Sequence, residues 1–217
     1  PLQHLTGEQD FMGLTFEVNE NVLIPRQDTE CLVEIVLKHL HDGMKILDMC
    51  TGSGCILISL LHYSNDCVGV GVDLSEAALK VATHNAAVLG SNGITDAMDI
   101  TFLQSNLFEK VDGKFDIIVS NPPYIKTEVI KTLMPEVRNF EPMMALDGTE
   151  DGLYFYRRII ADAKKHLTRG GQLFFEIGYD QGREVIDLMR ENGYVDVEVA
   201  KDLAGLDRVV YGTFLEE

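Results

Sequence analysis

The alternation of short apolar runs with segments of helical periodicity, from Lys45 onward, is the strongest constraint on the fold. The runs at residues 45–49 and 67–73 are each followed by a stretch long enough for a helix. Strands that alternate with helices form right-handed βαβ units and therefore a mainly parallel sheet. We therefore expect an α/β fold whose ligands bind at the carboxyl ends of the strands.

Seven strands are expected, at residues 45–49, 67–73, 100–105, 115–120, 172–178, 195–200 and 208–214. Helices are expected at residues 55–63, 75–90, 152–167 and 182–193. Ser75 should cap the second helix and Gly90 should end it. A turn at Arg169-Gly170-Gly171 should separate the third helix from the next strand. The short link between the last two strands predicts an antiparallel hairpin at the edge of the sheet.

The first part of the chain follows another pattern. Residues 11–18 alternate like a hairpin strand, and residues 28–40 have the periodicity of an amphipathic helix. We therefore divide the chain into an N-terminal β-hairpin and linker segment, residues 1–27, and a main domain, residues 28–217.

Charge and composition restrict the partners. Eighteen basic and 35 acidic residues give a formal net charge of −17. Such a surface repels phosphate backbones, so nucleic acid is not expected as a direct partner. Because no apolar run is long enough to span a bilayer and no leader pattern opens the chain, we expect no membrane partner and a cytoplasmic location. The four cysteines and six histidines lack metal-binding spacing, so no metal site is expected.

A glycine-rich turn, DMCTGSGC from Asp48 to Cys55, follows the first strand of the main domain and opens a helix. Gly52 and Gly54 allow a ligand to approach the backbone closely, although such a turn can also simply pack a helix on a sheet. Asp73 ends the next strand, about twenty positions later, where a carboxylate can accept hydrogen bonds from a ribose diol. A helix-capping role for Asp73 competes less well, because Ser75 serves that purpose. The pair indicates an adenosine-type ligand, with NAD, FAD and S-adenosylmethionine all possible.

The sequence Asn121-Pro122-Pro123-Tyr124 directly follows the strand at residues 115–120. The side-chain carbonyl of Asn121 and the backbone carbonyl of Pro122 can accept both hydrogens of a planar amino group. Tyr124 can add an aromatic face to the same group. Two acceptors would orient and polarise a weakly nucleophilic amide nitrogen. This motif favours S-adenosylmethionine-dependent methylation of a planar nitrogen over a simple exit of the chain from a strand. In a dehydrogenase the motif would have no role, so that class of enzyme is not expected.

Several segments together resemble the HemK/PrmC family of protein-(glutamine-N5) methyltransferases, which modify peptide-chain release factors. The resemblance covers essentially the whole chain, and its most specific parts are IPR-x-x-TE, FEP-x-x-AL and EIG-x-x-Q. It implies a Rossmann-like class I S-adenosylmethionine-dependent methyltransferase with a mainly parallel seven-stranded sheet and an antiparallel edge hairpin. Residues 28–217 would then be the methyltransferase catalytic domain.

The resemblance also implies a substrate and a site. The enzyme would methylate the glutamine of a Gly-Gly-Gln loop in release factors and leave S-adenosylhomocysteine as product. The sequence does not fix the oligomeric state, for which a monomer is the expectation. Cofactor contacts would come from Cys50, Thr51, Gly52, Ser53, Gly54, Asp73, Leu107 and Asn121. The substrate amide would meet Asn121, Pro122, Pro123 and Tyr124, of which Asn121, Pro122 and Tyr124 are the expected catalytic residues. Arg26 would lie near the cofactor.

Three departures from the family pattern stand out. Cys50 replaces a glycine, and Asn106 stands where an acidic residue is common. The small helical domain with which family members usually begin is expected to be absent. Two other functions stay open: an N6-adenine nucleic-acid methyltransferase, which shares the Asn-Pro-Pro-Tyr motif, and a non-catalytic cofactor-binding module.

Overall fold

The computed structural model describes residues 1–91 and 98–216, and a seven-stranded sheet with the order β5-β4-β3-β6-β7-β9-β8 lies at its centre. Its strands are β3 (Lys45–Met49), β4 (Val68–Asp73), β5 (Asp99–Gln104), β6 (Phe115–Ser120), β7 (Leu167–Glu176), β8 (Val195–Lys201) and β9 (Asp207–Phe214). The first five pair in parallel, whereas β9 pairs antiparallel with both β7 and β8. The predicted fold class and the antiparallel edge hairpin are confirmed.

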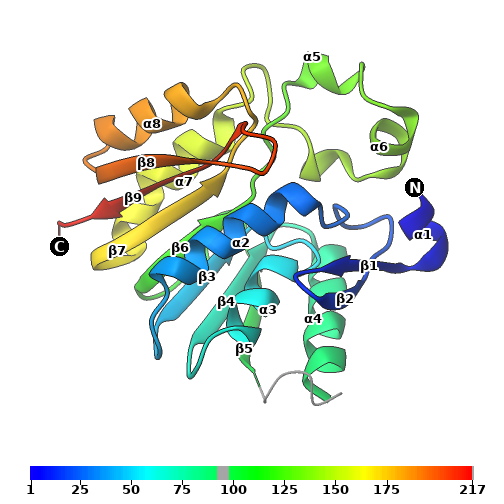
Figure 1. Cartoon of the computed structure of the whole chain (residues 1–217), viewed down its shortest axis with the longest axis horizontal. Coiled ribbons are helices and arrows are strands. Elements are labelled where there is room, and N and C mark those ends of the chain that lie inside the picture. Colours follow the sequence, from blue (N-terminus) through cyan, green and yellow to red (C-terminus); the bar gives the residue numbers. More distant parts are fainter. Residues whose placement is uncertain (92–97, 217) are drawn as a thin grey trace.

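Helices cover both faces of this sheet (Figure 1). On one face lie α2 (Gln27–His39), α3 (Cys55–His62) and α4 (Glu76–Ser91), and on the other α7 (Tyr154–Ala163) and α8 (Gly182–Glu191). Successive side chains of a strand point to opposite faces. Accordingly, Ile46 belongs to the apolar cluster that includes Leu57 of α3, while Leu47 belongs to the cluster that includes Ile160 of α7. Each helical layer therefore packs its own apolar cluster against one face of the sheet.

The N-terminal segment forms α1 (Leu2–Thr6) and a hairpin of β1 (Glu8–Phe11) and β2 (Leu14–Glu17). The prediction of one strand at residues 11–18 was wrong, because the hairpin turn falls inside it. Met12 and Gly13 both have positive φ, 52° and 75°, as a two-residue turn of this hand requires. Phe11 and Phe16 are buried in the same cluster as α2 and α3, so the hairpin packs on the main domain.

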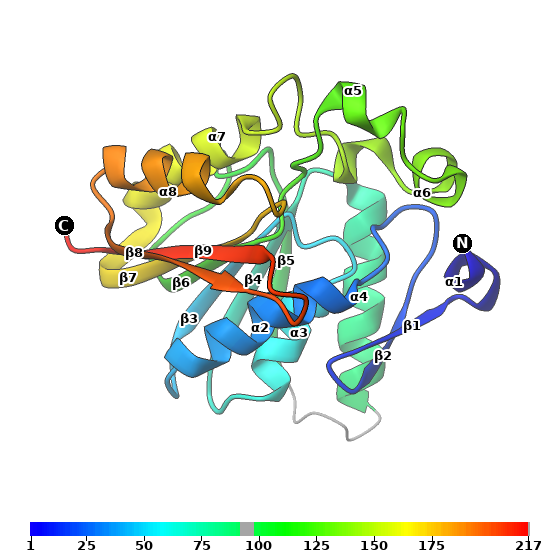
Figure 2. The same ribbon diagram turned by 45° about the horizontal axis from the view of Figure 1, so that its top comes forward.

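The connection between β6 and α7 carries three short helices that the sequence patterns did not predict: α5 (Thr127–Ile130), α6 (Pro135–Phe140) and the 3-10 helix η1 (Met143–Ala145). In both ribbon views α5 and α6 stand together, apart from the two helical layers (Figure 2). No helix in the described ranges is both long and apolar enough to cross a bilayer.

Two other predictions concern segment ends. Ser75 caps α4 as expected, since its Oγ accepts a hydrogen bond from the Ala78 amide at 3.1 Å. The turn at Arg169-Gly170-Gly171 was wrong, because these residues lie inside β7. There Gly170 has a φ of 82°, and the pairing with β6 shifts register between Leu167 and Gln172, so the glycines form a bulge-like irregularity inside the strand. The preceding helix ends at Ala163 and continues as the 3-10 helix η2 (Lys164–His166).

Candidate active site

A cavity of about 440 Å³ lies at the carboxyl ends of β3, β4, β5 and β6. The strand order reverses between β3 and β6, and ligands of open α/β sheets bind at this switch point. Residues predicted from the sequence that line it are Cys50, Thr51, Gly52, Ser53, Asp73, Leu107, Asn121, Pro123 and Arg26. Gly54 does not line it: with a φ of 83° it precedes α3, where a Cβ would lie 3.0 Å from the Ile58 side chain.

The glycine turn and Asp73 are joined directly. The Gly52 amide donates a hydrogen bond to Asp73 Oδ2 at 2.9 Å, and the Ser75 amide donates one to Oδ1 at 3.0 Å. Burial raises the pKa of Asp73, while the amide hydrogen bonds from Ser75 and Gly52 oppose that rise. Each carboxylate oxygen keeps a lone pair for a further donor, so the fixed carboxylate suits a ribose diol.

A second carboxylate, that of Asp48, lies fully buried beneath the turn. Thr51 Oγ1 donates a hydrogen bond to Asp48 Oδ2 at 2.7 Å, whereas Oδ1 has no partner among the described residues. Burial raises the pKa of Asp48 to about 7, and the nearby charge of Asp73 acts in the same direction. Asp48 does not line the cavity, so its carboxylate supports the turn from below through Thr51.

The Asn-Pro-Pro-Tyr segment lies at the other end of the cavity. Asn121 lines both the large cavity and an adjoining one of about 50 Å³, which Pro122 and Tyr124 also line. Within the described residues, neither the Asn121 side chain nor the Pro122 carbonyl has a hydrogen-bond partner. Two free acceptors thus flank a space large enough for a small planar group, and the larger cavity opens beside it.

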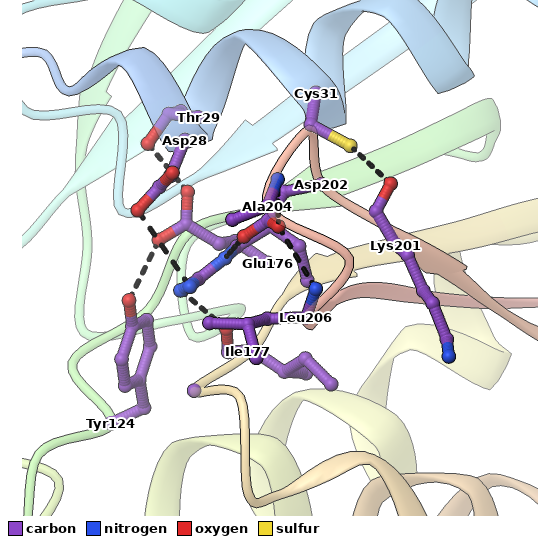
Figure 3. A network of polar contacts seen from close by, with 12 residues as sticks. Asp28, Thr29, Cys31, Tyr124, Glu176, Ile177, Lys201, Asp202, Ala204 and Leu206 are labelled. Carbon is purple, nitrogen blue, oxygen red and sulfur yellow. Dashed lines mark hydrogen bonds and ion pairs between the residues drawn. The ribbon is translucent and has the colours of Figure 1, made fainter.

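Tyr124 is fixed by residues that the sequence reasoning missed. Its hydroxyl donates a hydrogen bond to Glu176 Oε2 at 2.9 Å, and Thr29 Oγ1 donates one to Glu176 Oε1 at 2.5 Å (Figure 3). Burial, followed by the charge of Glu176, raises the pKa of Tyr124 well above its usual value, so the phenol stays protonated. Thr29 and Glu176 stand within the segments QDTE and FFEIG, whose only signal in the sequence was the family resemblance.

Comparisons with known proteins agree with this geometry. The family model for the methyltransferase small domain matches residues 27–137. The release factor glutamine methyltransferase of Thermodesulfovibrio yellowstonii is 42% identical over 215 residues, which cover 97% of this chain and 75% of that protein. The release factor glutamine methyltransferase of Moorella thermoacetica is 47% identical over 212 residues, covering 96% and 73%. The chain belongs to the release factor glutamine methyltransferase family.

A solved member of the family has the same fold. The release factor-specific protein-(glutamine-N5) methyltransferase of Alicyclobacillus acidocaldarius superposes with a TM-score of 0.53 at 33% identity, covering 93% of this chain and all of that one (100%). Membership confirms that the protein is a class I methyltransferase and that S-adenosylmethionine is its cofactor.

The departures from the family pattern lie at the cofactor end. Cys50 has a φ of 64°, the left-handed region that glycine adopts without strain, and Leu107 has a φ of 53°. Asn106 is exposed at the rim of the large cavity, where its amide can both donate and accept. Cys50 and Asn106 both line the cavity, and neither of them blocks it.

Arg26 lines the large cavity, and its contacts indicate a role that the resemblance left open. Its guanidinium donates two hydrogen bonds, each 3.0 Å, to the two carboxylate oxygens of the buried Glu141. The contact joins the loop before α2 to the segment after α6, and Pro142 and Met143 of that segment line the large cavity. Arg26 thus holds two walls of the cavity together.

Proposed function

We propose that this chain methylates the side-chain amide nitrogen of a glutamine in the Gly-Gly-Gln loop of peptide-chain release factors. The observation that carries the proposal is the unpartnered Asn121 side chain at the junction of the large and small cavities. The names of the relatives support the same substrate.

Each end of the site has a role in this proposal. The glycine turn of residues 50–54, Asp73 and Leu107 would hold the cofactor in the large cavity. Asn121 and the Pro122 carbonyl would accept the two hydrogens of the target amide. Tyr124 would complete the wall of the small cavity, and Pro123 would line the large cavity beside it. The amide nitrogen would then lie at the boundary between the two cavities, which only Asn121 spans among the proposed amide contacts.

The chemistry asked of the protein is positioning. When bound, S-adenosylmethionine supplies an electrophilic methyl group that needs no activation by the enzyme. Asn121 and Pro122 orient the amide, raise the electron density on its nitrogen and replace its hydration shell. As the nitrogen forms its bond to the methyl carbon, the sulfur–methyl bond would break to leave S-adenosylhomocysteine, and the nitrogen would release one proton to water, so no side-chain base has to act beforehand. Neither a covalent enzyme intermediate nor a metal is part of this proposal.

We also propose that the protein acts in the cytoplasm, in translation termination, and does not bind nucleic acid directly. The net charge of −17 supports the last point. A gel-shift experiment with duplex DNA at about 150 mM salt should show no complex at submicromolar protein. A complex would favour the adenine methyltransferase alternative.

The decisive experiment is incubation with radiolabelled S-adenosylmethionine and a purified release factor, followed by peptide mapping. Label is expected on the glutamine of the Gly-Gly-Gln peptide. A release factor in which that glutamine is replaced by alanine serves as the control and should stay unlabelled. Label on another residue, or none with a folded, cofactor-binding enzyme, would exclude the proposed function.

A further inference from the structure

The proposed chemistry leaves one buried carboxylate unused, that of Glu176. Glu176 is the last residue of β7 and is only 4% exposed. It lines the small cavity together with Asn121, Pro122 and Tyr124. Burying a carboxylate costs free energy unless the carboxylate is hydrogen-bonded, so the partners of Glu176 indicate what it does.

Two hydroxyl groups reach Glu176 from different elements. In Figure 3, Thr29 in the first turn of α2 and Tyr124 from the loop after β6 approach the carboxylate from two sides. The buried Arg208 of β9 donates hydrogen bonds to Asp202 Oδ2 at 3.2 Å and to the Ile177 carbonyl at 3.1 Å, which places its charge nearby. Burial raises the pKa of Glu176, and the hydroxyls and then the Arg208 charge oppose that rise.

The backbone of Tyr124 is held as firmly as its hydroxyl. Gln181 Nε2 donates a hydrogen bond to the Tyr124 carbonyl at 3.0 Å. A Cβ at Gly148 would lie 2.7 Å from Tyr124 Cα, and one at Gly152 would lie 2.6 Å from the Tyr124 carbonyl oxygen. With the backbone wedged in this way, the contact with Glu176 fixes the remaining freedom of the ring.

We propose that Glu176 is a positioning and specificity-determining residue for glutamine methylation, acting through Tyr124. By accepting the hydrogen bond from the Tyr124 hydroxyl, Glu176 fixes the ring as a wall of the small cavity. The phenolic oxygen can then act toward a ligand only as a hydrogen-bond acceptor. Asn121 Oδ1 and the Pro122 carbonyl are acceptors as well. The inference rests on the proposed function, because it concerns the same amide.

This arrangement distinguishes an amide from a carboxylate. The –NH₂ group of glutamine has two donors, which match a cavity wall made of acceptors. The carboxylate of glutamate would place lone pairs against lone pairs, beside the buried charge of Glu176, and such a mismatch excludes a ligand strongly. Glu176 therefore contributes to the choice of glutamine over glutamate without touching the transferred group.

The test compares Glu176→Gln, Tyr124→Phe and the double variant in steady-state methylation of a purified release factor. Each single change should lower kcat about 10- to 100-fold, because the ring loses its fixed orientation. The KM for S-adenosylmethionine should stay within about threefold, because the cofactor lies in the other cavity. The double variant should be no worse than the more impaired single variant, because both changes remove one shared contact. Losses that multiply, or a Glu176→Gln enzyme with wild-type kcat, would overturn the inference.

The chain offers a matched control. Tyr211 Oη donates a hydrogen bond to Glu198 Oε2 at 2.7 Å, an exposed pair between β8 and β9. Glu198→Gln removes an equivalent contact outside the site and should leave kcat unchanged. Should Glu176→Gln fail to fold, Thr29→Val takes its place: it should lower kcat less than tenfold, and Thr29→Ser, which keeps the hydroxyl, should lose less than Thr29→Val. Equal kcat for Thr29→Val and wild type would count against the inference.

A readout without substrate separates this inference from the proposed function. Fluorine NMR of protein labelled with 3-fluorotyrosine reports on Tyr124, whose signal is assigned by its loss in Tyr124→Phe. Glu176→Gln should shift or broaden that signal, and Glu198→Gln should leave it in place. An unmoved signal refutes the positioning role whatever the substrate is. A moved signal in an enzyme that does not label release factors supports the role of Glu176 and refutes the substrate.

Discussion

The two ends of the active site are built in different ways. At the cofactor end, the turn after β3 and Asp73 at the end of β4 meet through backbone amides, and the partners are 21 residues apart. At the amide end, Tyr124 depends on side chains from distant elements, since Thr29 and Glu176 are 147 residues apart. The joined glycine turn and Asp73 are therefore a local device of one βαβ unit, whereas the contacts that fix Tyr124 require α2, the loop after β6 and the end of β7 to come together.

This difference assigns separate tasks to the two ends. A cradle of backbone amides and one carboxylate accepts a shared part of many ligands, an adenosine, with little dependence on side-chain identity. Recognition of one planar amide requires side chains with fixed donor and acceptor roles. Substitutions at the amide end should therefore change turnover, and substitutions at the cofactor end should change affinity.

The largest expected effect tests the amide end. Asn121→Ala removes one of the two free acceptors and should lower kcat about 100- to 1000-fold, while the affinity for S-adenosylmethionine stays within a few fold. Asn121→Asp keeps an acceptor but loses a donor and adds a charge, so its defect should be smaller. Single-turnover methylation of a release factor and calorimetric titration of the cofactor give the two quantities. Near-normal turnover in Asn121→Ala would show that this segment does not bind the amide.

The next effect tests the cofactor end. Asp73→Ala removes the proposed acceptor of the ribose hydroxyls and should weaken S-adenosylmethionine binding by roughly 1.5–3 kcal/mol, measured by calorimetry. The change also deprives the Gly52 and Ser75 amides of their acceptor. Asp73→Asn, which can still accept from one of these amides, should therefore bind more tightly than Asp73→Ala. Wild-type affinity in Asp73→Ala would refute the assignment of the ribose site.

The two ends also differ in how far the sequence alone revealed them. The closeness of Asp73 to the glycine turn could be predicted, because in a βαβ unit the end of the second strand lies beside the turn that follows the first. The Arg26–Glu141 pair, 115 residues apart, and the partners of Tyr124 arise from tertiary packing, which periodicity does not encode. The irregularity at Gly170 was missed for a related reason, because glycines inside a strand and glycines at a turn give the same local signal. The strand ranges themselves were predicted to within a few residues, except for β7.

A smaller effect concerns the buried Asp48. Its pKa of about 7 lies above the ordinary value of 3.8, so between about pH 4 and 7 the folded protein holds a proton that the unfolded chain has lost. The free energy of unfolding must then fall as the pH rises through this window. Asp48→Asn carries no such charge and should lose less stability between about pH 5 and 8. Calorimetric unfolding of the cofactor-free protein should show a Tm difference of a few degrees at about pH 8. Parallel pH curves for the two proteins would contradict this.

The smallest effect is expected at Cys50, where it tests whether the cofactor end depends on side-chain identity. In Cys50→Gly the left-handed backbone, with its φ of 64°, is relieved of a strain of about 1 kcal/mol. The same change removes a side chain that packs against the apolar cluster containing Ile160, and it raises the conformational entropy of the unfolded chain. Together these two effects cost a similar amount of stability. The free energy of unfolding should therefore change by less than about 1 kcal/mol.

Cofactor affinity in Cys50→Gly should change by less than about threefold, because we propose that backbone amides and Asp73 form the cofactor contacts at this end. Thermal unfolding and calorimetric titration with S-adenosylmethionine measure the two quantities, and Asp73→Ala provides the comparison at the end of the neighbouring strand β4. A change in affinity above tenfold would mean that the Cys50 side chain itself shapes the cofactor cavity. The cofactor end would then depend on side-chain identity as the amide end does, and the contrast between them would fail.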